Sequence, residues 1–147
     1  MSKIVKIVSL ITLNPIIIFG LYIISHGHLT PGGGFQGGVI VASIAILILV
    51  VFENDINLSK NLFSLFESLG LIFFITLAFL GTFKNTFFYN FLANKFWFLG
   101  KTIHFGINQG FLNSGGVIPL MNLAVGIEVA SALSLIAVLI MSKKKYD

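Results

Sequence analysis

Four long apolar runs, at about 4–25, 35–52, 62–83 and 117–141, constrain the fold of this chain more than any other feature. Each is close to the roughly 20 residues that an α-helix needs to cross the hydrocarbon core of a bilayer. Only 10% of the residues are charged, whereas a soluble domain carries about 25%. The sequence therefore predicts an all-α integral membrane protein, with residues 1–147 forming one membrane domain of about four transmembrane helices.

The distribution of the lysines predicts the orientation of these spans. All nine basic residues are Lys, and four spans place both termini and the loop at 53–61 on the same side. That side carries six lysines, and the opposite side carries three. Because lysine-rich loops stay in the cytoplasm, we expect a multi-pass protein of the cell membrane with both termini cytoplasmic. Lipid then surrounds the spans, and no basic face remains for nucleic acid.

A glycine-rich stretch from His26 to Gly38 opens the second run and holds six of the fifteen glycines. Gly34, Gly38 and Ala42 follow one another at intervals of four, so they share one face of a helix. Small residues at this spacing let two helix backbones approach closely in lipid. We interpret this stripe as a close-packing seam between helices. It is not a phosphate loop, because the Lys and Ser or Thr that such a loop requires are missing.

Pro15 lies near the middle of the first run. It has no backbone N–H, so the carbonyl of Ile11 loses its usual donor, and we expect a helix kink there. Two interpretations stay open. The kink serves helix packing alone, or it forms a hinge beside an ion path.

Glu128 is the most informative single residue, because it lies near the middle of the last run, about 16 Å from Val117 at roughly 1.5 Å per residue. An ionisable side chain at that depth is costly and is a functional candidate. Ser131 shares its helix face, and Asn122 lies in the same run. These three residues form a candidate ion path or subunit interface. The alternatives are a structural hydrogen bond or a neutral acid. We interpret Glu67, near the start of the third run, as an edge residue.

The connection from Lys84 to Gly116 is rich in aromatic residues in its first half, including Phe87, Phe88, Tyr89 and the run Phe96, Trp97, Phe98. Aromatic residues interleaved with lysines are typical of the membrane–water boundary. The pattern predicts an interfacial segment between the third and fourth helices, folded as a helix or a hairpin along the surface.

The sequence predicts no catalytic, cofactor-binding or metal site. Cysteine is absent, which excludes disulfides and thiolate ligands. His26, His28 and His104 have no carboxylate near them on their side of the membrane. We therefore interpret them as packing residues, with proton exchange at the surface as an alternative.

Two separated motifs resemble a known family. The run Pro31–Gly38, "PGGGFQGG", and the run Ser114–Val129, which contains "NLAVG", are similar to the MnhB-type small membrane component of Mrp-type (also called Mnh) multisubunit Na⁺/H⁺ antiporters. The resemblance covers most of the chain and is densest at 26–45 and 114–135.

The resemblance implies a noncatalytic membrane subunit that helps to form or support a cation or proton path. Its partners would be other membrane subunits of an Mrp-type antiporter, or of a membrane-bound hydrogenase-type oxidoreductase complex, with Na⁺ and H⁺ as the ions. It implies no cofactor for this chain. Two alternatives stay open: a self-contained homo-oligomeric cation transporter or channel, and a purely structural membrane scaffold.

Overall fold

The computed structural model describes residues 1–52, 59–84, 86–95, 99–102 and 111–144. It contains four α-helices, α1 (Lys3–Ser25), α2 (Gly34–Val51), α3 (Lys60–Leu80) and α4 (Ile118–Lys144), with a short 3₁₀ helix, η1 (Gly81–Lys84), after α3. Each of the four is long and apolar enough to cross a membrane. The prediction of an all-α membrane protein with four transmembrane helices is therefore confirmed.

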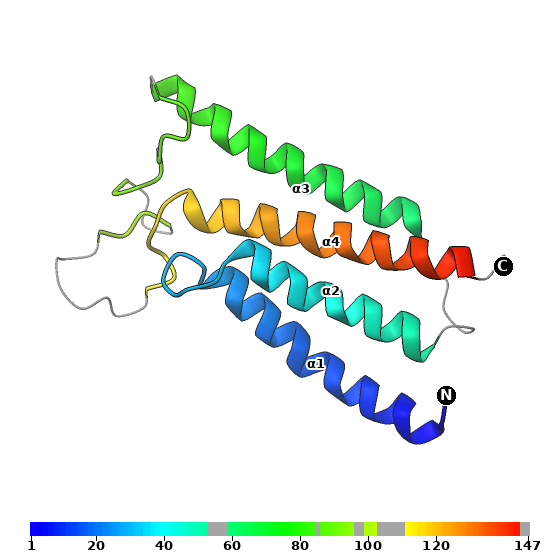
Figure 1. Cartoon of the computed structure of the whole chain (residues 1–147). Helices are drawn as coiled ribbons and strands as arrows, with labels where there is room; N and C mark the ends of the chain where they lie inside the picture. The colour runs from blue at the N-terminus through cyan, green and yellow to red at the C-terminus, as the bar shows by residue number, and fades with distance from the viewer. Residues whose placement is uncertain (53–58, 85, 96–98, 103–110, 145–147) are drawn as a thin grey trace.

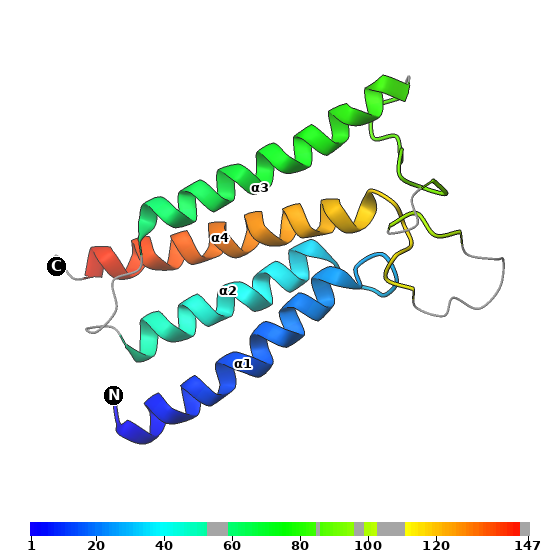
Figure 2. The same ribbon diagram turned by 180° about the vertical axis from the view of Figure 1, so that it is seen from behind.

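The helices lie side by side in the order α1, α2, α4, α3, so that α4 separates α2 from α3 (Figures 1 and 2). The main packing pairs are α1 with α2, α2 with α4, and α3 with α4. The starts of α1 and α3 lie at the same end of the bundle as the end of α4 (Figure 1). The glycine loop, residues 26–33 between α1 and α2, lies at the opposite end. The last helix in the sequence is thus the central one in space.

Burial inside the chain is confined to the lines where helices cross. Ala42, Ala78 and Ala124 are at most 1% exposed, whereas Ile4, Ile18 and Ile140 are 67% exposed or more. A soluble protein does not leave so many large apolar side chains in water. In this chain they face the bilayer or neighbouring subunits.

Pro15 lies inside α1 and is exposed, and α1 continues as one helix from Lys3 to Ser25. The hydroxyl of Thr12 donates to the carbonyl of Val8 at 2.8 Å, one turn before the proline. The predicted kink at Pro15 stays a prediction.

The connection after α3 differs from the expectation. Residues 86–95 form turns and not a surface helix. Phe88 and Asn94 have positive φ angles of 60° and 59°, which a helix does not allow. The chain doubles back on the end of α3, where the amide of Phe88 donates to the carbonyl of Ala78 at 3.3 Å. Phe96, Trp97, Phe98 and His104 lie outside the described residues.

Asn90 fixes the start of α4 from this connection. Its side-chain Nδ2 donates to the carbonyl of Gly115 at 2.9 Å, and its Oδ1 accepts from the amide of Val117 at the same distance. A helix start leaves its first amides without intrahelical acceptors, so Asn90 places α4 relative to the end of α3.

Candidate functional site

The glycine loop joins α1 to α2 and turns back sharply at the end of α1. The amides of Leu29 and Thr30 donate to the carbonyl of His26 at 2.8 and 3.0 Å. Gly32 and Gly33 then adopt φ angles of 142° and 131°. Only glycine reaches such angles without strain, so these two residues are required by the turn itself.

The loop rests against Asn122 of α4. A Cβ atom added to Gly27 would lie 2.7 Å from the Asn122 Nδ2, and one added to Gly33 would lie 3.3 Å from its Oδ1. A Cβ added to Gly34 would collide with the Asn122 carbonyl oxygen and would lie 3.0 Å from the amide nitrogen of Gly126. The two motifs of the sequence, although they are far apart in the chain, therefore pack directly on one another.

The contact continues down α2 into the membrane. A Cβ added to Gly38 would lie 2.9 Å from the carbonyl oxygen of Gly126 and 3.0 Å from the Cβ of Val129. Ala42, one turn further, is 1% exposed. The structure thus places Gly34, Gly38 and Ala42 inside the chain, with the two glycines directly on α4.

Helix α1 closes on the other side of α2. A Cβ on Gly37 would lie 2.8 Å from the carbonyl oxygen of Gly20, and one on Gly20 would lie 2.7 Å from Val41. A Cβ on Gly126 of α4 would lie 2.8 Å from Ile24 of α1. We call the joint packing of α1, α2 and α4 at Gly20, Gly34, Gly37, Gly38 and Gly126 the glycine seam. Gly20 was not among the predicted residues, because a single glycine within an apolar run has no pattern that marks it.

Glu128 lies at a different contact, on the α3 side of α4. A Cβ on Gly70 of α3 would lie 2.9 Å from both the carbonyl oxygen of Ala124 and the amide of Glu128, and 3.0 Å from the Glu128 Cβ. We call this packing of α3 on α4 at Gly70 the α3–α4 seam. Glu128 is half-buried. Gly70 was also absent from the predicted site, for the same reason as Gly20.

Ser131 is 7% exposed and lines a cavity of about 320 Å³ together with side chains from α2 and α3. Its lining is otherwise dominated by apolar residues, among them Ala45, Phe63 and Phe66. Glu128 and Asn122 do not line this cavity. The three predicted site residues therefore occupy three places along α4: Asn122 at the glycine loop, Glu128 at the α3–α4 seam and Ser131 at the cavity.

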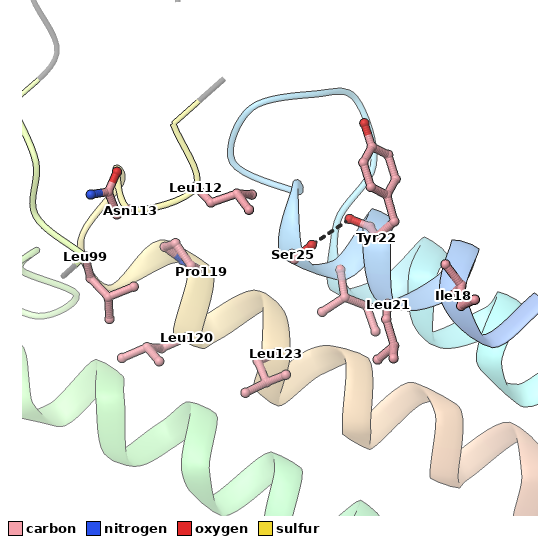
Figure 3. A pocket seen from close by; sticks show the side chains of 11 residues that line it. Ile18, Leu21, Tyr22, Ser25, Leu99, Leu112, Asn113, Pro119, Leu120 and Leu123 are labelled. Carbon is pink, nitrogen blue, oxygen red and sulfur yellow. Dashed lines mark hydrogen bonds between the residues drawn. The ribbon is translucent and has the colours of Figure 1, made fainter. Parts of the chain in front are cut away.

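A larger pocket of about 820 Å³ lies between α1, α4 and the connection before α4 (Figure 3). Tyr22 and Ser25 stand at the α1 end of its wall, and Asn113 belongs to the connection. The rest of its wall is apolar and includes Ile18, Leu21, Leu99, Leu112, Leu120 and Leu123. Such a wall binds hydrocarbon and offers no acid, base or nucleophile.

The histidines lie around the glycine loop. The ring of His26 stacks on Tyr22 with centroids 3.9 Å apart, and its Nδ1 lies 2.9 Å from the Tyr22 carbonyl oxygen. Both ring nitrogens of His28 are buried without a hydrogen-bond partner, as is the Nδ2 of Asn122. Within the described part of the chain, no three His, Cys, Asp or Glu side chains come together in a metal-binding group.

Comparison with known sequences agrees with these motifs. The family described as "Domain related to MnhB subunit of Na+/H+ antiporter" matches residues 4–135. An uncharacterised protein of Methanocaldococcus jannaschii is 32% identical over 128 residues, which cover 85% of this chain and 47% of that protein. The MnhB-type component of a Na⁺/H⁺ antiporter from Bacillus subtilis is 42% identical over 48 residues, 33% of this chain and 31% of that protein. The chain thus matches a third to a half of the length of these relatives.

Proposed function

The chain belongs to the family of the MnhB subunit of Na⁺/H⁺ antiporters, and from that premise we propose that it is a noncatalytic membrane subunit of a multisubunit cation/proton antiporter. The observation that carries the proposal is the direct packing of the glycine loop on Asn122 and Gly126 of α4. The two motifs through which the chain resembles this family form one contact. Its other subunits are the partners, and Na⁺ and H⁺ are the ions exchanged.

The glycine seam gives α4 a fixed position. Gly34 and Gly38 bring the α2 backbone against the backbone of α4, and any larger side chain there would meet main-chain atoms. Main-chain atoms of a packed helix move little. In the proposed function, α4 is therefore a rigid element that holds Glu128 at a constant depth in the membrane.

Glu128 is the residue proposed to act on the cation or proton path. It is ten residues from Ile118, about 15 Å into the helix at roughly 1.5 Å per residue. A carboxyl group at that depth either binds a proton or neutralises a cation. Ser131 and Asn122 lie on the same helix, about one and two turns away, and we propose that they line or support the path.

The proposed orientation places both termini in the cytoplasm and the glycine loop outside. A tag at the C-terminus should be reached by a membrane-impermeant reagent only after the cells are opened. The host assembly is an antiporter in this proposal. Hydrogenase-type subunits in the purified complex would instead assign the chain to a redox-driven oxidoreductase complex.

The test replaces Glu128 with Gln in the complete complex and measures Na⁺-driven proton movement in inverted vesicles. We expect at least a tenfold loss of rate with normal assembly, and partial retention in Glu128→Asp. Leu139→Gln adds the same amide on the same side of α4, at an exposed position, and should leave the rate unchanged. An unchanged rate in Glu128→Gln would leave only the scaffold function. A purified homo-oligomer that moves Na⁺ alone in liposomes would replace the proposal with the self-contained transporter.

A further inference from the structure

We infer that the side of the α3–α4 seam that carries Glu67 and Glu128 is a docking surface for a membrane helix of another subunit, one with a Lys or Arg side chain at the same depth. The inference rests on the proposed function, because it needs a multisubunit complex. It adds the surface, the chemistry of the partner and a second acidic residue, Glu67, which the sequence pattern alone places at the edge of a span.

The geometry brings the two carboxylates to one level of the bundle. Helices α3 and α4 run antiparallel, since Lys60 at the start of α3 donates to Ser142 near the end of α4 at 2.8 Å. Gly70 lies opposite Ala124 and Glu128. Glu67 is three residues from Gly70, which is less than one turn, and in the direction in which α4 numbers rise. It therefore stands at the level of Glu128, about 10 Å inside α3 at roughly 1.5 Å per residue.

Both side chains are only half-buried, so each is open on the side that faces away from the seam. Within the described residues, neither carboxylate has a hydrogen bond or ion pair. Among the described elements, the helices that pack on α3 are α4 and η1. Lys60 lies seven residues from Glu67 and bonds to Ser142. The chain thus supplies no described cation at this depth.

The surroundings of the pair are apolar. Leu71, one turn from Glu67 on the same side of α3, is 47% exposed, and Leu139, three turns from Glu128 on the same side of α4, is 48% exposed. Lipid tails on this surface would leave two acidic groups without compensation, at a cost that membrane proteins avoid by pairing such groups. A basic side chain from a neighbouring helix compensates both, while Leu71 and Leu139 pack against that helix.

A second copy of this chain does not fit the same surface. A symmetric contact would bring the same residues of both copies together, and so would add two further carboxylates instead of a cation. The charge of the surface therefore selects a different subunit, one with a basic residue in the middle of a transmembrane helix.

The first test uses a photo-crosslinking amino acid at Leu71 in the assembled complex, with both glutamates intact. Leu69 is the matched control, because it is the same residue type, is 50% exposed and points to the opposite side of α3. We expect the Leu71 probe to react with a helix of another subunit that contains Lys or Arg, and the Leu69 probe to give no adduct with that helix. Adducts of Leu71 with lipid alone, or with a second copy of this chain, would overturn the inference.

The second test reverses charge. The double variant Glu67→Lys, Glu128→Lys should lower co-purification of the crosslinked subunit at least tenfold, and changing the basic residue of that subunit to Glu should restore it. Unchanged co-purification of the double variant would contradict the inference. If the tagged wild-type chain captures no antiporter subunit at all, the proposed function itself fails. If it captures them and Leu71 reacts only with lipid, the docking surface alone is wrong.

Discussion

The two seams of this molecule use glycine for different purposes. The glycine seam joins three helices through five glycines, and its contacts are with main-chain atoms on both sides of α2. The α3–α4 seam has one glycine, Gly70, and two carboxylates at the level of that glycine. The first leaves α2 no room to move, whereas α3 has a single neighbouring α-helix among those described. Rigidity and assembly are thus assigned to separate sides of α4.

The largest expected effect comes from Gly38→Leu in the glycine seam. The new side chain would meet the carbonyl of Gly126, which cannot move because α2 is held between α1 and α4. We expect a loss of about 3 kcal/mol of stability, the upper range for overpacking. Assembly of the complex should fall before any effect on transport is seen. The measurement is the yield of intact complex after affinity purification.

Val39→Leu is the matched control for that experiment, because Val39 is adjacent to Gly38 and 38% exposed. It should assemble normally. An intact complex with Gly38→Leu would show that the seam tolerates separation, and the contrast between the two seams would lose its basis.

Gly70→Leu should have a smaller effect, although its contacts are equally short. A Cβ there lies 2.9 Å from main-chain atoms of Ala124 and Glu128, but α3 is free to shift away from α4. We expect a loss of about 1–2 kcal/mol, with the chain still folded and the α1–α2–α4 packing intact. Thermal unfolding in detergent measures the loss, with Leu69→Phe on the exposed side as the control. A loss as large as that of Gly38→Leu would mean that the two seams are equivalent.

The sequence predicts one seam far better than the other, for a physical reason. Gly34, Gly38 and Ala42 repeat every four residues and so mark a helix face from the sequence alone. Gly70 stands alone in an apolar run, and nothing local shows that it faces Glu128. The interpretation of Glu67 as an edge residue counts depth only along its own helix. Its level relative to Glu128 depends on the register of α3 against α4, which is a tertiary contact.

The four helices were predictable because the length and hydropathy of a run are local properties. The connection before α4 was not, because its course depends on long-range contacts. The Asn90 side chain bonds to residues 25 and 27 positions away, and the amide of Gly116 donates to the carbonyl of Leu99 at 2.8 Å. Aromatic composition indicates a boundary segment and does not determine such pairings.

Asn90→Ala tests whether the two seams depend on a common anchor. The change removes both hydrogen bonds that hold the start of α4, with an expected cost of about 1–2 kcal/mol. Because α4 belongs to both seams, each should loosen to a similar small extent, seen as faster hydrogen exchange at the first turns of α4. Asn61→Ala, at an exposed position in α3, is the control. Faster exchange at one seam alone would show that the seams are anchored independently.

The smallest expected effect is that of Pro15→Ala on the α1 side of the glycine seam. Pro15 is exposed, one turn or more from Gly20, and α1 is continuous through it. Alanine would restore the amide that the carbonyl of Ile11 lacks. If the proline only shapes α1, the antiport rate should stay within twofold and stability should be equal or higher. A hinge beside an ion path would instead lose most of its rate with assembly unchanged. Measuring both quantities in one vesicle preparation separates these outcomes, and a loss of rate alone would mean that the glycine seam holds α2 and α4 rigid while α1 moves.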